Sequence, residues 1–147
     1  MTLVLDGSLG ITSGIGPTVI QTNYSTTISA GTLAINTATG LGTTGGATTV
    51  SSGGALEISG GITVAEPITI SGTGVSSGGA IAFTSGTNTY SGAITLAADS
   101  TIKSTSGNQT ISGTINGAYA ATITATDNLT LSGTIGGNAP PTSLSVT

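Results

Sequence analysis

The chain has 147 residues, of which 31 are threonine, 25 are glycine and only six are charged, and its net charge is −4. Charged residues make up 4% of the sequence, against about 25% in typical soluble domains, and histidine and cysteine are absent. This composition excludes an imidazole base, a thiolate nucleophile and a Cys/His metal site. With Lys103 as the one cation, it also argues against binding to nucleic acid or to an anionic membrane surface.

A short signature recurs along the chain, in which threonine, an apolar residue and serine are followed by glycine within two residues. Successive threonines of the signature are 22, 20, 20, 21 and 20 residues apart. Its six copies are Thr27-Ile28-Ser29, Thr49-Val50-Ser51, Thr69-Ile70-Ser71, Thr89-Tyr90-Ser91, Thr110-Ile111-Ser112 and Thr130-Leu131-Ser132. Threonine and β-branched residues favour strands, and Ser-Gly favours turns, so each copy predicts a short strand that ends at a bend.

Two further apolar columns run out of phase with the signature. The second column consists of Leu33/Ile35, Leu56/Ile58, Ile81/Phe83, Ile102, Ile123 and Leu144/Val146. The third contains Ile94/Leu96, Ile115 and Ile135. Between residues 50 and 81 a 25-residue match competes with the 20-residue spacing, and a bulge or loop between Gly60 and Pro67 would reconcile the two.

These columns predict an all-β fold, a right-handed parallel β-helix (β-solenoid) formed by one domain over residues 1–147. A unit of 20–25 residues cannot bury its own apolar face, but stacking it on copies of itself creates one continuous core. About seven coils at a strand spacing of about 4.8 Å would form a rod of about 30–35 Å. The alternative is an antiparallel β-sandwich, which does not require one signature at a fixed period.

Several stretches resemble the autotransporter-associated β-strand repeats of large bacterial exoproteins. They are GLGTTGGATTVSSGGALEISGGITV (40–64), EPITISGTG (66–74), NTYSGAITLAADSTI (88–102), NQTISGTING (108–117) and LSGTIGG (131–137). The resemblance covers about residues 28–147. It implies a right-handed β-helix, export to the cell surface or medium, and service as a stalk or adhesive shaft. A signal peptide and a membrane translocator, which accompany such repeats, are not recognised, so we interpret the chain as an excerpt or a stand-alone unit.

The acidic residues do not form a predicted catalytic or metal site. They are Asp6, Glu57, Glu66, Asp99 and Asp127, and they lie 9 to 51 residues apart, mostly on different coils. Polysaccharide cleavage needs carboxylates that converge, and calcium-binding β-rolls need an acid on every turn. We therefore expect these acids to be solvated at turns, and we expect no enzyme activity, metal or cofactor.

The outward hydroxyls of the signature are the candidate binding surface. Because the apolar residue of each copy points inward, the flanking Thr and Ser point outward together. Stacked coils would place them in one two-column array of Thr27, Ser29, Thr49, Ser51, Thr69, Ser71, Thr89, Ser91, Thr110, Ser112, Thr130 and Ser132. Such an array suits ice or a glycan, whereas the simpler interpretation is that threonine suits an exposed strand and Ser-Gly suits the corner after it.

Neither end of the predicted rod carries an obvious polar cap. The strand pattern resumes at Ser143-Leu144-Ser145-Val146, and an open solenoid end exposes unpaired backbone groups over an apolar core. We therefore expect the partner to be the chain itself, stacked end to end, or flanking coils of a longer chain. The predicted function is that of a non-catalytic structural module, extracellular or on a bacterial cell surface, without nucleic-acid binding or membrane insertion.

Overall fold

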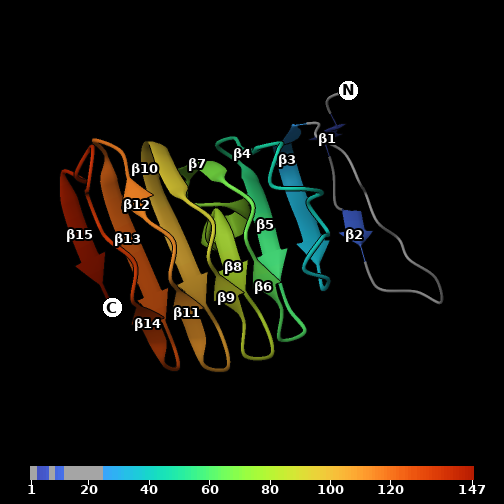
Figure 1. Ribbon diagram of the computed structural model, residues 1–147. Coiled ribbons are helices and arrows are strands. Elements are labelled where there is room, and N and C mark those ends of the chain that lie inside the picture. Colours follow the sequence, from blue (N-terminus) through green and yellow to red (C-terminus); the bar gives the residue numbers. More distant parts are fainter. Residues whose placement is uncertain (1–2, 7–8, 12–24) are drawn as a thin grey trace.

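The computed structural model describes residues 3–6, 9–11 and 25–147, with side chains from residue 25 onward. The chain is a right-handed parallel β-solenoid of about six turns, which confirms the predicted fold class with about one coil fewer than expected. Every strand pairing among the described residues is parallel. In Figure 1 successive coils follow one another across the molecule, from the N-terminal to the C-terminal end. The solenoid has three faces, here called face 1, face 2 and face 3.

Face 1 carries the first half of the signature copies. Its strands are β1 (Leu3–Asp6), the first half of β3 (Thr26–Ile35), β4 (Thr48–Val50), β7 (Ile68–Gly72), the first half of β10 (Ile94–Ser104) and β12 (Ile115–Asn116). Ile28, Val50, Ile70 and Leu96 form its buried column. Ile115, which pairs with Ile94, forms an isolated bridge to Ile135, so the third column of the sequence lies on this face.

Face 2 reproduces the second column. Its strands are β2 (Leu9–Ile11), the second half of β3, β5 (Gly54–Ile58), β8 (Ile81–Phe83), the second half of β10, β13 (Ala120–Ala125) and β15 (Ser143–Val146). A single register runs through Leu33, Leu56, Ile81, Ile102, Ile123 and Val146. The prediction for this column is confirmed from Leu33 to Ile123, whereas the last coil is offset by two residues, because Val146 and not Leu144 pairs with Ile123.

Face 3 is a separate four-stranded sheet that contains the last three signature copies. It consists of β6 (Thr63–Val64), β9 (Thr89–Tyr90), β11 (Gln109–Ile111) and β14 (Leu129–Leu131). Val64, Tyr90, Ile111 and Leu131 are in register.

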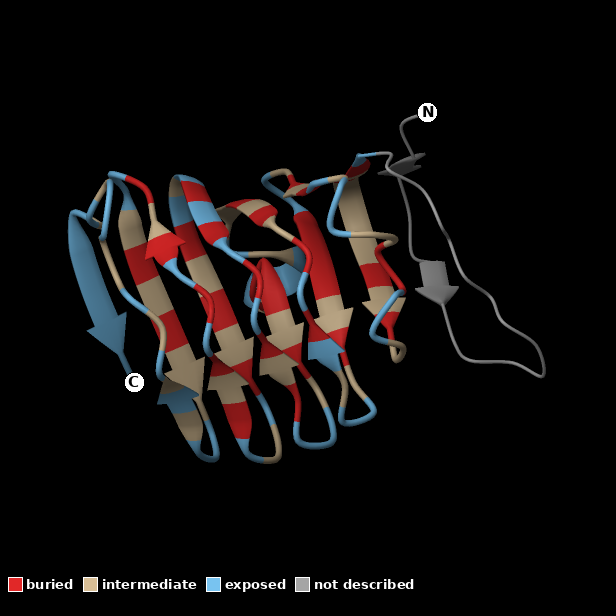
Figure 2. Ribbon diagram, in the orientation of Figure 1, coloured by how far each residue is buried: buried red, intermediate tan, exposed pale blue. Residues whose placement is uncertain are grey.

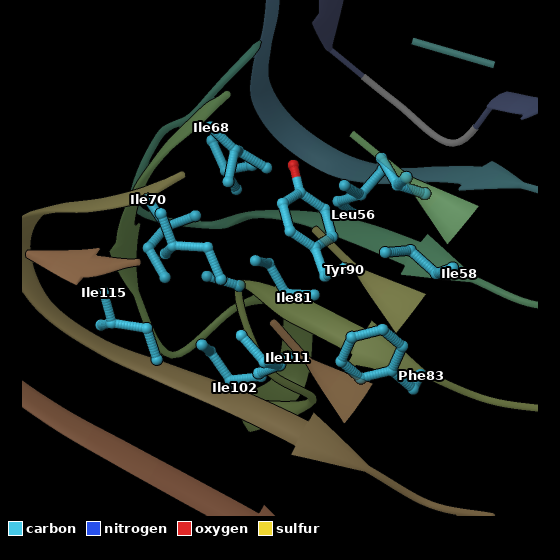
Figure 3. Close-up of a cluster of buried hydrophobic side chains, with 14 of the residues drawn as sticks. Leu56, Ile58, Ile68, Ile70, Ile81, Phe83, Tyr90, Ile102, Ile111 and Ile115 are labelled. Carbon is cyan, nitrogen blue, oxygen red and sulfur yellow. The ribbon is translucent and has the colours of Figure 1, made fainter. Parts of the chain in front are cut away.

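The core is the space that the three faces enclose (Figure 2). Its two largest fully buried side chains are Tyr90 from face 3 and Phe83 from face 2. Figure 3 shows both rings among leucine and isoleucine side chains from several coils. Stacked columns of this kind bury apolar surface continuously, which is the main favourable contribution to folding.

One coil is longer than the others, and the extra residues lie elsewhere than predicted. On face 1, Val50 and its partner Ile70 are 20 residues apart in the sequence, whereas Ile70 and its partner Leu96 are 26 residues apart. Residues 60–67 contain β6, a regular part of face 3, so the predicted bulge there is wrong. The additional residues form a loop between β7 and β8 that contains the 3-10 turn η1 (Val75–Ser77).

A buried amide pair closes one corner of the solenoid. The Asn88 Oδ1 atom accepts hydrogen bonds from the backbone N–H groups of Gly61 and Ile62, at 2.9 and 3.0 Å. The Gln109 Oε1 atom, one coil later, accepts from both the backbone N–H and the Nδ2 of Asn88, at 2.9 and 3.0 Å. The pair thus satisfies corner backbone groups that the sheets leave free.

Candidate functional site

The predicted hydroxyl array is divided between two faces. Thr27, Thr49 and Thr69 are paired side by side on face 1, and the row continues to Thr95, not to Thr89. Thr89, Thr110 and Thr130 lie on face 3 in a row with Thr63. The prediction of one continuous array is therefore wrong. The 20-residue step from Thr69 to Thr89 equals a coil length but in fact crosses from one face to another.

The serines of the signature lie beside these threonines and start the corners. Ser29, Ser51 and Ser71 are half-buried on face 1, whereas Ser91, Ser112 and Ser132 are exposed on face 3. The Ser91 Oγ atom donates to the Val64 carbonyl at 3.2 Å, so at least one of the predicted hydroxyls also serves the fold. What remains is two rows of threonine hydroxyls with about 4.8 Å between neighbours.

The side chain of Asp6 lies outside the described residues, and two of the other acids support turns of the neighbouring coil. The Asp99 carboxylate accepts from the Ala120 N–H at 2.8 Å, and the Asp127 carboxylate accepts from the Gly107 N–H at 2.9 Å. Within the described part of the chain, no group of three acidic, histidine or cysteine side chains could hold a metal ion.

Glu66 departs from the prediction, because it is buried rather than solvated. It is 3% exposed, and its Oε1 accepts a hydrogen bond from the Thr48 hydroxyl at 2.7 Å, while its Oε2 is buried without a partner. Burial raises the pKa of this carboxyl, and the Thr48 hydrogen bond opposes the rise. The Tyr90 hydroxyl donates to the backbone carbonyl of Glu66 at 2.8 Å, and burial also raises the pKa of that phenol, with a further contribution from Glu66.

A pocket of about 250 Å³ lies on the outer surface of face 2. Its floor is a cross-strand row in which Ala82 pairs with Glu57 on one side and with Lys103 on the other. Thr84 and Thr105 line it as well, and Val75 and Gly79 contribute from the β7–β8 loop. Sequence reasoning missed this pocket. The signal was the run of extra residues at 73–79, which lengthens this coil relative to the other coils of residues 25–147.

The last strand leaves apolar side chains uncovered. All four residues of β15 are exposed, with Leu144 43% and Val146 60% exposed. Val146 is in register with the buried column of face 2, and its side chain is exposed. Leu131 and Ile135, from the other two faces, are only partly buried.

Comparisons with known proteins add no functional information. No family model, no curated protein and no solved structure matches the chain. A helix long and apolar enough to cross a membrane is not found among residues 3–6, 9–11 and 25–147.

Proposed function

We propose that the protein is a non-catalytic structural module, a β-solenoid rod segment whose C-terminal end docks onto a further coil of the same kind. The observation that carries this proposal is β15, a fully exposed strand at the edge of its sheet whose Val146 stands in the apolar column of face 2. A strand edge above an apolar column is a template for pairing. Another coil would cover Leu144 and Val146 and continue the backbone ladder.

The rest of the rod supports a mechanical role. Successive coils are joined by parallel backbone ladders on faces 1 and 2, and four of them also on face 3, and the same apolar columns run through successive coils. Such an arrangement resists bending and local opening, because separating two coils exposes a full layer of the core. The resemblance of the repeats to those of bacterial exoproteins supports a location of the proposed rod outside the cell, as the shaft of a surface protein or as a fibre protomer.

Sedimentation velocity of the purified chain over a range of concentrations tests the docking. We expect species larger than the monomer to increase with concentration. Val146→Lys should remain monomeric, because a lysine in the apolar column opposes burial of the end. Thr122→Lys adds the same charge at an outward position of β13, next to Ser145 of β15, and should associate like the wild type. A wild-type chain that stays monomeric at every concentration would contradict self-docking.

The threonine row of face 1 favours a second candidate, binding of ice or of a glycan through its hydroxyls. Thr27, Thr49, Thr69 and Thr95 stand side by side on four successive coils. Inhibition of ice recrystallisation and glycan-array binding by the chain are the direct assays. Thr49→Lys should abolish either activity, with Thr122→Lys on face 2 as the control, and absence of both activities in the wild type would remove this candidate.

A further inference from the structure

The loop between β7 and β8 covers part of the pocket on face 2, which distinguishes this pocket from the other outward surfaces. Successive side chains of a strand point to opposite faces, so Ala55, next to the inward Leu56 in β5, points outward. Its side chain is nevertheless only 5% exposed. The loop between β7 and β8 lines the pocket together with Ala55. Hydrogen bonds from the Gly79 N–H to the Thr73 carbonyl and from the Gly78 N–H to the Val75 carbonyl, both 2.8 Å long, fix the loop's shape.

Two opposite charges line this pocket without pairing with each other. Lys103 is the only cation of the chain, and it is half-buried, as is Glu57. Among the described residues the Lys103 ammonium has no ion pair, while the Glu57 carboxylate accepts a hydrogen bond from the Thr84 hydroxyl at 3.1 Å. Glu57 and Lys103 occupy the same cross-strand row on either side of Ala82, so their backbones are about 9.6 Å apart, twice the strand spacing.

This separation fits a ligand that carries both charges. In an α-amino acid the ammonium nitrogen and a carboxylate oxygen are about 3 Å apart. With a charge-assisted hydrogen bond of about 2.8 Å at each end, the ligand bridges groups about 8.5 Å apart. The two protein side chains need to lean toward each other only slightly to reach it. A pocket of about 250 Å³ is smaller than the usual sites for drug-sized ligands, so it suits one small molecule or one sugar ring.

We propose that this pocket binds a small zwitterion, with its ammonium on Glu57 and its carboxylate on Lys103. The Thr84 hydroxyl holds the Glu57 carboxylate in place, and Ala82 and Val75 contact the apolar part of the ligand. The zwitterion can be a free amino acid or an amino sugar that bears a carboxylate, since both present the same pair of charges. The site is independent of end-to-end docking, because face 2 remains accessible along the side of the rod.

Titration of the ¹⁵N-labelled chain with L-alanine and, separately, with muramic acid tests the proposal. We expect saturable amide shifts confined to the pocket, at Gly78, Gly79, Ala82 and Thr84. Saturation by L-alanine identifies a site for free amino acids, and saturation by muramic acid alone identifies an amino-sugar site. Propionate, which lacks the ammonium, and ethylamine, which lacks the carboxylate, should bind at least tenfold more weakly, since each loses one charge-assisted hydrogen bond.

Two variants assign the contacts. Lys103→Met and Glu57→Gln should each weaken binding about tenfold or more. Asp99→Asn changes the net charge by the same amount as Glu57→Gln and lies outside the pocket, so it should bind like the wild type. The proposal is overturned if neither zwitterion shifts the pocket amides, if propionate or ethylamine binds as tightly as the zwitterion, or if Asp99→Asn weakens binding as much as Glu57→Gln.

Discussion

The substitution Gln109→Leu tests how much the buried amide pair contributes to stability. Gln109 is 1% exposed, and its Nε2 donates to the carbonyls of Gly86 and Ser106, both at 2.7 Å. Its Oε1 accepts the two hydrogen bonds from Asn88. Leucine has nearly the same size but removes all four bonds and leaves the buried backbone N–H of Asn88 without its acceptor.

We expect Gln109→Leu to lower the free energy of unfolding by about 3–5 kcal/mol. Each lost hydrogen bond contributes about 1 kcal/mol, and an orphaned buried group adds about 1–3 kcal/mol, partly offset by the apolar side chain. Urea unfolding followed by far-ultraviolet circular dichroism measures the change. Asn128→Ala is the control, because it removes an exposed amide–amide hydrogen bond to Asn108 and should cost well under about 1 kcal/mol. A loss below about 1 kcal/mol for Gln109→Leu would refute the reasoning.

Two further predictions concern a carboxyl and two glycines. Burial raises the folded-state pKa of Glu66, so the unfolded chain loses this proton first as pH rises, and the free energy of unfolding should fall between about pH 4 and the raised pKa. Glu66→Gln should abolish that part of the decline, measured as urea midpoints against pH. A pH profile that Glu66→Gln leaves unchanged would show that Glu66 does not titrate abnormally. Gly113→Ala should lower the free energy of unfolding more than Gly53→Ala in the same assay, because a Cβ at Gly113 collides with the Gly92 carbonyl of the preceding coil, whereas Gly53 has open space and only a positive φ of 93°. The φ effect alone should lower the free energy of unfolding by about 1 kcal/mol. Equal losses for the two variants would contradict the collision.

Face 2 could be predicted from the sequence because every one of its coils keeps an apolar residue in step. Leu33, Leu56, Ile81, Ile102 and Ile123 are all paired as the spacing indicated. The signature failed for a physical reason, since it marks corners rather than one face. Gly53 follows face 1 with a positive φ, and Gly113 follows face 3 where backbones approach closely, so the same Ser-Gly motif meets two different requirements. Because the coil that contains the β7–β8 loop is longer than the others, the 20-residue step from Thr69 on face 1 to Thr89 on face 3 has the length of one ordinary coil.

The candidate sites depend on features that have no period, and single-sequence reasoning therefore missed them. Glu57 and Lys103 are 46 residues apart in the chain and share a pocket only because Ala82 lies between them in the sheet. Glu66 was expected to be solvated, but the corner before β7 directs it toward Thr48. The first outcome depends on coil register, which the extra residues of the β7–β8 loop obscure in the sequence.

Electron microscopy combined with fibre diffraction of the concentrated chain tests the central claim, that this parallel solenoid continues by end-to-end docking. We predict unbranched filaments of uniform width with an axial spacing of about 4.8 Å from coils stacked along the filament. Discrete particles at every concentration, or an axial pattern without this spacing, would contradict it.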